Sequence, residues 1–303
     1  MQMDQTNTQR NFTGIFFMLL AALGFSVMGG FAKQLRHSFT APQLVFYRNL
    51  VGLMVLSVSL IQNPVKQTGG RLGLLMFRGL MGTLALYSLL FLILHIPLGT
   101  AMTYNSTNTF YIALLSFFLL KEKLNTIGWV CIVVGFVGIL LIYRPSIDFN
   151  WSYHLIGILH GIFSALAYLS IGRLNKHYDS RIIVLSFLLT GIIIPILSWV
   201  IGTVFSIPND PLFFTFFKLP QDFEWLLVLG LGVSALMGQY YVTKAYSNDK
   251  AGIISAVGYS NIVFGLAVGI ILGDQFPDLL GFAGVLMIIA SGVVISLTKE
   301  KIQ

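Results

Sequence analysis

The chain is a series of long apolar segments separated by short polar or turn-forming stretches. Most segments have about 20 residues, the length that a helix needs to cross a bilayer core of about 30 Å. The segments expected as transmembrane helices are about 12–33, 42–61, 72–94, 97–120, 125–143, 153–173, 181–203, 223–245, 249–273 and 277–297. The pattern predicts an all-α integral membrane protein with ten transmembrane helices.

Composition supports this interpretation. Of the 303 residues, 56% are hydrophobic and 10% are charged, whereas a soluble domain has about 25% charged residues. Ten spans would occupy about two thirds of the chain, so no separate soluble domain is expected. The single cysteine, Cys131, lies in an apolar run and is expected to be buried, which leaves no disulfide framework. Because no small-residue cleavage site follows the first apolar run, that run is expected to remain as a helix.

The net charge of +7 is explained by orientation in the membrane, so no nucleic-acid partner is expected. The side that holds the N-terminus carries Arg10, Lys66, Arg71, Lys121, Lys123, Arg173, Lys176, Arg181, Lys244, Lys250, Lys299 and Lys301. The other side carries Lys33, Arg36, Arg144 and Lys218. Basic residues concentrate on the cytoplasmic side of membrane proteins. Both tails, residues 1–11 and 299–303, are therefore predicted to be cytoplasmic, in a cell inner membrane.

The two halves of the chain repeat. A shift of 143 residues superimposes Gly14, Ile15, Ala22, Leu23, Gly29 and Lys33 on Gly157, Ile158, Ala165, Leu166, Gly172 and Lys176. A shift of 153 residues superimposes Gly99, Asn108, Leu119 and Gly128 on Gly252, Asn261, Leu272 and Gly281. A repeat with five spans must insert its copy upside down. We therefore expect two inverted five-helix repeats, residues 12–145 and 151–298, a construction typical of secondary transporters with a midplane site.

Several short strings carry a family resemblance. They are Phe46-Tyr47-Arg48, Phe77-Arg78-Gly79, Ile96-Pro97-Leu98-Gly99-Thr100-Ala101, Leu119-Leu120-Lys121-Glu122-Lys123-Leu124 and Tyr259-Ser260-Asn261-Ile262-Val263-Phe264. In their order and spacing the chain resembles the EamA-type branch of the drug/metabolite transporter superfamily over nearly its whole length. Two positions depart from that pattern. Residues 105–109 replace the proline usual in the fourth span, and Gly273-Asp274 stands where Gly-Glu is usual.

The resemblance implies a ten-helix carrier that works by alternating access. Its cavity would be lined by the first, third, fourth, sixth, eighth and ninth helices. Members of the family move amino acids, nucleobase-like and sulfonium metabolites, or drugs, and many are exporters. The missing proline puts the usual kink of the fourth helix in doubt and indicates a more polar cavity wall.

The fourth span holds a run of polar side chains, residues 103–109, in the middle of a bilayer segment. Unmet hydrogen-bonding groups are costly in hydrocarbon, so this run is expected to face protein or water. Interhelical hydrogen bonding is the alternative. The candidate substrate-binding residues here are Tyr104, Asn105, Thr107 and Asn108, with Tyr259, Ser260 and Asn261 in the ninth span. Asn108 and Asn261 are related by the repeat, and an amide both donates and accepts, so this pair is the first candidate.

Three further side chains, those of Arg78, His160 and Gln239, are candidates for substrate binding. Arg78, six residues into the third span, would neutralise a substrate carboxylate or phosphate, or extend to the cytoplasmic headgroups. For Arg48, at similar depth from the other surface, a structural role is favoured. His160 in the sixth span would carry protons or be held by a neighbour. Gln239 adds a further polar contact. No Asp or Glu lies mid-span, so a coupling ion has no obvious carboxylate ligand.

The expected function is secondary transport of a small polar metabolite or drug-like solute, as an exporter, with membrane lipid and a coupling proton or exchanged solute as partners. No metal, cofactor or enzymatic activity is expected. An intramembrane enzyme is disfavoured because the sequence contains no His-x-x-x-His, no paired intramembrane carboxylates and no Gly-x-Ser-x-Gly. A non-transporting receptor or scaffold remains the other alternative.

Overall fold

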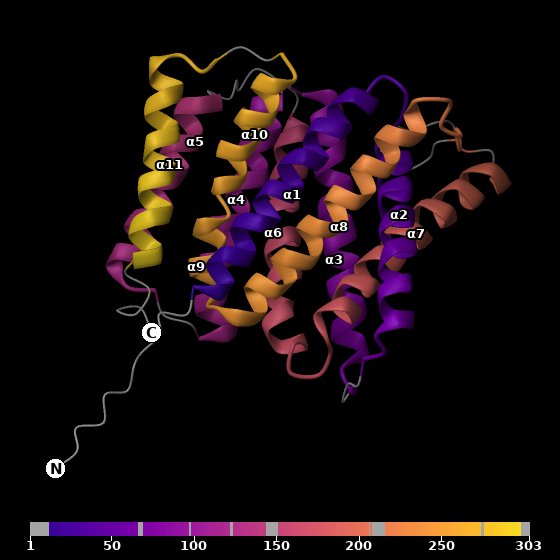
Figure 1. The fold of residues 1–303 in the computed structure, drawn as a ribbon, viewed down its shortest axis with the longest axis horizontal. Coiled ribbons are helices and arrows are strands. Elements are labelled where there is room, and N and C mark those ends of the chain that lie inside the picture. The colour runs from indigo at the N-terminus through magenta and orange to yellow at the C-terminus, as the bar shows by residue number, and fades with distance from the viewer. Residues whose placement is uncertain are drawn as a thin grey trace.

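A computed structural model describes residues 12–65, 69–96, 98–121, 124–143, 151–205, 207, 216–273 and 276–297, and every regular element within these ranges is a helix. The helices are α1 (Thr13–Leu35), α2 (Ala41–Gln62), α3 (Leu72–His95), α4 (Leu98–Leu115), η1 (Ser116–Leu120), α5 (Thr126–Tyr143), α6 (Trp151–Leu174), α7 (Ser180–Val204), α8 (Glu224–Asn248), α9 (Ala251–Val257), α10 (Ser260–Ile271) and α11 (Leu279–Leu297). They form one bundle (Figure 1). The expected tails, residues 1–11 and 299–303, lie outside the described residues. So do Arg10, Lys66, Lys123, Arg144, Lys299 and Lys301 from the orientation count.

Each of the ten expected apolar segments corresponds to a helix or to an interrupted helix. In the described part of the chain, seven spans are long and apolar enough to cross a membrane, namely α1, α2, α3, α6, α7, α8 and the α9–α10 segment. The apolar helices α5 and α11 are shorter. The protein is therefore a multi-pass, all-α membrane protein.

Two segments that the sequence predicted as continuous are interrupted. The fourth segment changes from an α-helix to the π-helix η1 for its last turn, and Lys121 then ends it in the left-handed conformation, with φ of 57°. The ninth segment breaks at Gly258 and Tyr259, between α9 and α10. Glycine weakens a helix, and at this break the ring of Tyr259 lies against Gly135 of α5. Gly258 and Tyr259 keep right-handed helical backbone angles, with φ of −57° and −59°. Tyr259, Asn261 and Ile262 each donate to the carbonyl three residues earlier, so the interruption is a tightened helical turn.

Glycines allow the closest helix approaches in the bundle. α1 packs along α8, and a Cβ on Gly24 would lie 2.7 Å from the backbone nitrogen of Gly238. α5 packs along α11, and a Cβ on Gly138 would lie 2.7 Å from the carbonyl oxygen of Gly284. Small residues let membrane helices gain dispersion contacts where no hydrophobic driving force exists between them.

The helix neighbours follow a regular pattern when α9 and α10 are counted together as the ninth span. α1 packs on α8, and five spans later α6 packs on α3. α4 packs on α6, just as α10 packs on α1. α2 contacts α8, and α7 contacts α3, while α2·α7 and α5·α11 pair counterparts with each other. These pairs thus match when each helix is exchanged for its counterpart five spans later, although α6 contacts α8 whereas α1 has at most a slight contact with α3.

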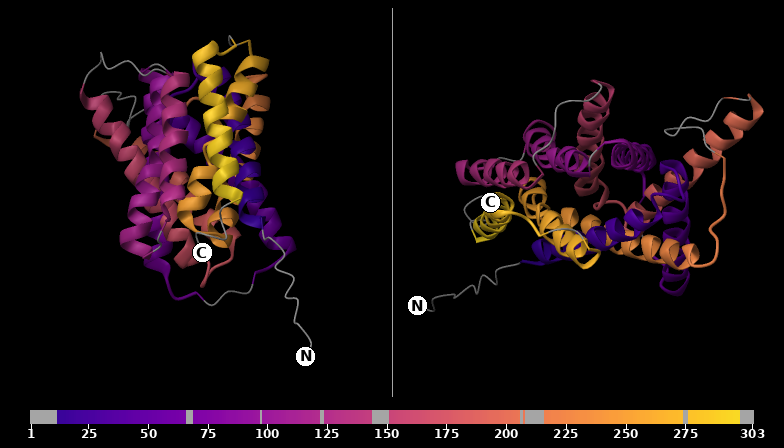
Figure 2. Two further views of the ribbon diagram at one scale, coloured as in Figure 1. Left: turned by 90° about the vertical axis from the view of Figure 1, so that its left-hand side faces the viewer. Right: turned by 90° about the horizontal axis from the view of Figure 1, so that it is seen from above.

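The ends of the bundle are distinguishable. α1 begins and α11 finishes at the same end, whereas α1 finishes at the opposite end (Figures 1 and 2). At that opposite end, residues 216–220 cover the start of α2. The hydroxyl of Tyr47 donates to the carbonyl of Lys218 at 2.6 Å, and the Lys218 ammonium lies 5.4 Å from the centre of the Phe39 ring.

Candidate substrate cavity

A cavity of about 300 Å³ lies in the middle of the bundle, a volume typical of a small-molecule site. The expected helices all contribute to its lining, namely α1, α3, α4, α6, α8 and the α9–α10 segment. α2 and α7 add one side chain each, Arg48 and Phe187. Along α1 the lining runs from Met18 past the end of the helix to Arg36, which is exposed. The cavity therefore extends to the end of the bundle where α1 finishes.

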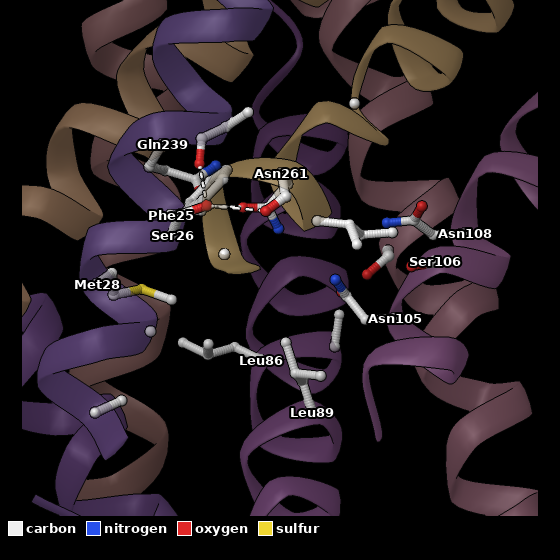
Figure 3. A pocket seen from close by; sticks show the side chains of 18 of the residues that line it. Phe25, Ser26, Met28, Leu86, Leu89, Asn105, Ser106, Asn108, Gln239 and Asn261 are labelled. Atoms are coloured by element: carbon white, nitrogen blue, oxygen red, sulfur yellow. Dashed lines mark hydrogen bonds between the residues drawn. The ribbon is translucent and has the colours of Figure 1, made fainter. Parts of the chain in front are cut away.

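One face of α4 forms a polar wall. Asn105, Ser106, Asn108 and Thr109 line the cavity, and Figure 3 shows the first three of them on one side of it. Thr109 also donates to the carbonyl of Ser255 in α9 at 3.2 Å. The polar run predicted from the sequence thus serves two purposes, since it lines the cavity and ties α4 to the interrupted ninth span.

Tyr104 and Thr107, two of the predicted binding residues, do not line the cavity. They lie on the face of α4 that packs against α6, where the Tyr104 ring covers Gly157 and its hydroxyl contacts Nδ1 of His154. The Thr107 hydroxyl donates to the carbonyl of Tyr104 at 2.6 Å. These side chains are interhelical contacts, the alternative that the sequence left open for this run.

The break between α9 and α10 brings Tyr259 and Asn261 to the cavity, whereas Ser260 lies outside its lining. Oγ of Ser26 in α1 is 2.8 Å from Oδ1 and 2.9 Å from the carbonyl oxygen of Asn261 (Figure 3). The Ser26 hydroxyl has one hydrogen to donate. The oxygen and the nitrogen of the Asn261 amide group cannot be distinguished by the shape of the group, so either could face Ser26. In either amide orientation, Ser26 fixes the Asn261 side chain beside the cavity.

The predicted pair Asn108 and Asn261 therefore lines a single cavity from two spans related by the sequence repeat. In Figure 3 the two amides lie on different sides of the space, with Asn105 and Ser106 near Asn108 and Phe25 and Gln239 near Asn261. A solute between them would meet amide donors and acceptors from both halves of the chain.

His160 is 2% exposed and lines the cavity from α6. Its Nδ1 lies 2.8 Å from the carbonyl of Ala85, which can only accept, so Nδ1 carries a hydrogen. Its Nε2 lies 3.1 Å from Oδ1 of Asn105. A neutral ring would require the Asn105 amide to present its nitrogen, whereas a protonated ring would donate to the oxygen. The protonation of His160 thus determines which amide atom Asn105 turns to the imidazole.

Arg78 and Arg48 both line the cavity, and they are 1% and 4% exposed. Because the Arg78 side chain is buried inside the bundle, it does not extend to the lipid headgroups, which was the alternative role considered for it. The two guanidinium carbons lie 5.3 Å and 5.4 Å from the centre of the same ring, that of Phe187. Nε and Nη2 of Arg78 and Nε and Nη1 of Arg48 have no hydrogen-bond partner. The sequence favoured a structural role for Arg48, and no local signal indicated that it would share a ring with Arg78.

Further side chains complete the lining of the cavity. Tyr168 and Tyr246 stack with ring centres 5.1 Å apart, and Ser26 holds Asn261. Gln239, which was predicted, is 4% exposed, and its Nε2 has no partner. Among the described residues, no group of three or more His, Cys, Asp or Glu side chains could hold a metal ion.

A multi-pass helical bundle that encloses a cavity with polar side chains from both halves of the chain is the architecture of a membrane transporter. Comparison with known proteins gives the family. The EamA-like transporter family matches residues 12–144, and two relatives at 30% identity or more match about 95% of the chain. The protein belongs to the EamA-like family of transporters, within the drug/metabolite transporter superfamily, and members of this family are transporters rather than enzymes.

Three relatives show the range of the family. A protein described as an uncharacterized transporter of Helicobacter pylori is 34% identical over 94% of each chain. The pseudopaline exporter CntI of Pseudomonas aeruginosa is 30% identical over 95% of this chain and 97% of its own. An S-adenosylmethionine uptake transporter of Rickettsia conorii is 24% identical over 95% and 94%. A crystal structure with 15% identity superimposes with a TM-score of 0.73 over 94% of this chain and 98% of that chain, which supports the fold.

Proposed function

We propose that the protein is a secondary transporter that exports a small polar solute across the cell inner membrane by alternating access. In this proposal residues 12–145 and 151–298 are inverted repeats that rock around the central cavity, with residues 1–11 and 299–303 in the cytoplasm. A coupling proton or an exchanged solute drives the cycle, and His160 is the titratable imidazole of the cavity lining.

The proposal rests mainly on one observation about the cavity lining. Asn108 and Asn261, which correspond in the sequence repeat, line the same cavity. Their helices come from different halves of the chain, so a solute bound between the amides would contact both bodies whose relative movement opens and closes the site.

The pattern of helix neighbours supports the repeat. Exchanging each helix for its counterpart five spans later converts the α1·α8 contact into α6·α3 and the α4·α6 contact into α10·α1. A twofold-related pair of bodies would produce this pattern. Because each repeat has five spans, the second would lie upside down relative to the first.

The direction of transport is drawn from the relatives. The P. aeruginosa relative, at 30% identity, is named an exporter, and the R. conorii relative, at 24% identity, is named an uptake transporter. We take export from the more similar of the two.

Flux measurements on single-residue variants test the proposed site. Asn108→Leu and Asn261→Leu keep similar side-chain volume but remove every hydrogen bond that the amides can make. We expect each variant to lose transport by at least about fivefold, because a buried polar group without its partner costs about 1–3 kcal/mol. Uptake or efflux in vesicles gives the rate, and the yield of folded protein in detergent reports on folding.

Asn248→Leu is the matched control, because Asn248 is exposed at the end of α8 and outside the cavity lining. Wild-type flux in both cavity variants would refute the site. Solute binding without net flux in the wild-type protein would instead favour the receptor or scaffold alternative.

A further inference from the structure

The described lining of the cavity has four cationic side chains, Lys33, Arg36, Arg48 and Arg78, and contains no Asp or Glu. Lys33 and Arg36 lie at the end of the bundle where α1 finishes, and Arg36 is exposed there. Arg48 and Arg78 lie deeper and are almost completely buried. A cavity lined by charge of one sign concentrates ions of the opposite sign.

The two deep arginines lack the partners that buried charges normally have. Two nitrogens of each guanidinium are buried without a hydrogen bond, and the described salt bridge of Arg181 with Asp179 lies elsewhere, at the start of α7. An ionisable side chain inside a membrane protein is costly and usually pairs with another group or marks a substrate path. The Phe187 ring contacts both guanidinium groups but supplies no negative charge.

We propose, on the basis of the transport function above, that the solute is a small organic anion whose carboxylate or phosphate group binds at Arg48 and Arg78. The anion enters past Lys33 and Arg36, and its charged oxygens satisfy the unpartnered nitrogens of the two guanidinium groups. The fork of an arginine matches the geometry of both oxyanions. Asn108 and Asn261 then bind the polar remainder of the solute.

The charge balance of the cavity excludes the other solute classes. A solute without a negatively charged group would leave the two buried cations uncompensated, and a solute with only positive groups would add a further positive charge without any lining carboxylate to offset it. The aromatic rings of Tyr168 and Phe187 could hold a cation in isolation, but here the guanidinium groups already lie at Phe187.

The test uses proteoliposomes incubated in a small-molecule extract of the organism that encodes the protein. Solutes retained after washing are identified by mass spectrometry and sorted by charge at pH 7. The variants are Arg48→Gln and Arg78→Gln, which remove the charge, together with Arg48→Lys and Arg78→Lys, which keep it. Arg181→Gln is the matched control, because Arg181 already has Asp179 as a partner and lies outside the cavity.

We expect the wild-type protein to enrich organic anions, and the carboxylates or phosphates among them identify the bound group. Each glutamine variant should reduce that enrichment by at least about tenfold, each lysine variant should retain part of it, and Arg181→Gln should retain all of it. Enrichment only of solutes that carry no carboxylate or phosphate group overturns the anion proposal and leaves the transporter intact. Equal losses in the glutamine and lysine variants also overturn it, because they indicate a steric role. Absence of any enrichment by the wild-type protein contradicts the transport function itself.

Discussion

At the scale of single residues, glycines within one helix have different tasks. Gly24 and Gly29 both lie in α1, five residues apart. A Cβ on Gly24 would lie 2.7 Å from the backbone of α8, whereas a Cβ on Gly29 would have no heavy atom within 4 Å. Gly24 is therefore needed for helix packing, while Gly29 leaves open space where the cavity lies.

Gly24→Ala should destabilise the protein and Gly29→Ala should not. The methyl group on Gly24 meets backbone, which cannot rotate away, so α1 and α8 must separate at a cost of about 1–3 kcal/mol. On Gly29 the same methyl is free and slightly favours the helix. Thermal unfolding in detergent compares the two variants, and equal melting temperatures would show that the α1–α8 approach is not the limiting contact.

At the scale of elements, the interruption between α9 and α10 is fixed from two sides. Tyr259 lies against Gly135 of α5, where an added Cβ would be 2.5 Å from ring atom Cδ2. Asn261 is held by Ser26 of α1. Contacts with α5 and with α1 thus hold the ninth span so that both side chains reach the cavity.

Gly135→Ala should weaken transport. The added methyl displaces the Tyr259 ring from α5 toward the cavity that it lines, so we expect a higher KM for the solute with folded protein still obtained. Gly292→Ala, on α11 with no heavy atom within 4 Å of the added Cβ, is the control. Flux assays across solute concentrations measure the effect, and an unchanged KM in Gly135→Ala would mean that the ring does not shape the site.

At the scale of the whole molecule, the number and position of the helices could be predicted because the bilayer sets the length of each apolar segment. The pairing of Asn108 with Asn261 in one cavity could also be predicted, since the repeat relates them. The tightened turn at Gly258 and Tyr259 could not, because a single glycine inside an apolar segment is also compatible with a continuous helix.

The site itself was partly beyond sequence reasoning. The polar run of α4 covers every face of the helix, so the sequence could not tell that Asn105 and Asn108 face the cavity while Tyr104 faces α6. Likewise, the convergence of Arg48 in α2 and Arg78 in α3 on Phe187 depends on α7, which lies more than 80 residues further along the chain. Such contacts follow from tertiary packing and leave no local pattern.

Alternating exposure of the cavity is the central claim, and a single cysteine in its wall tests it most directly. Replacing Cys131, the one cysteine of the sequence, with alanine gives a background in which Gly29→Cys places a thiol in open space of the lining. Lys218→Cys and Asn248→Cys, near opposite ends of α8, mark the two faces of the membrane. A membrane-impermeant maleimide is applied to intact cells and to inverted vesicles. We predict that each marker reacts from one face and that the thiol at position 29 reacts from both. Reaction of that thiol from a single face would contradict transport by alternating access.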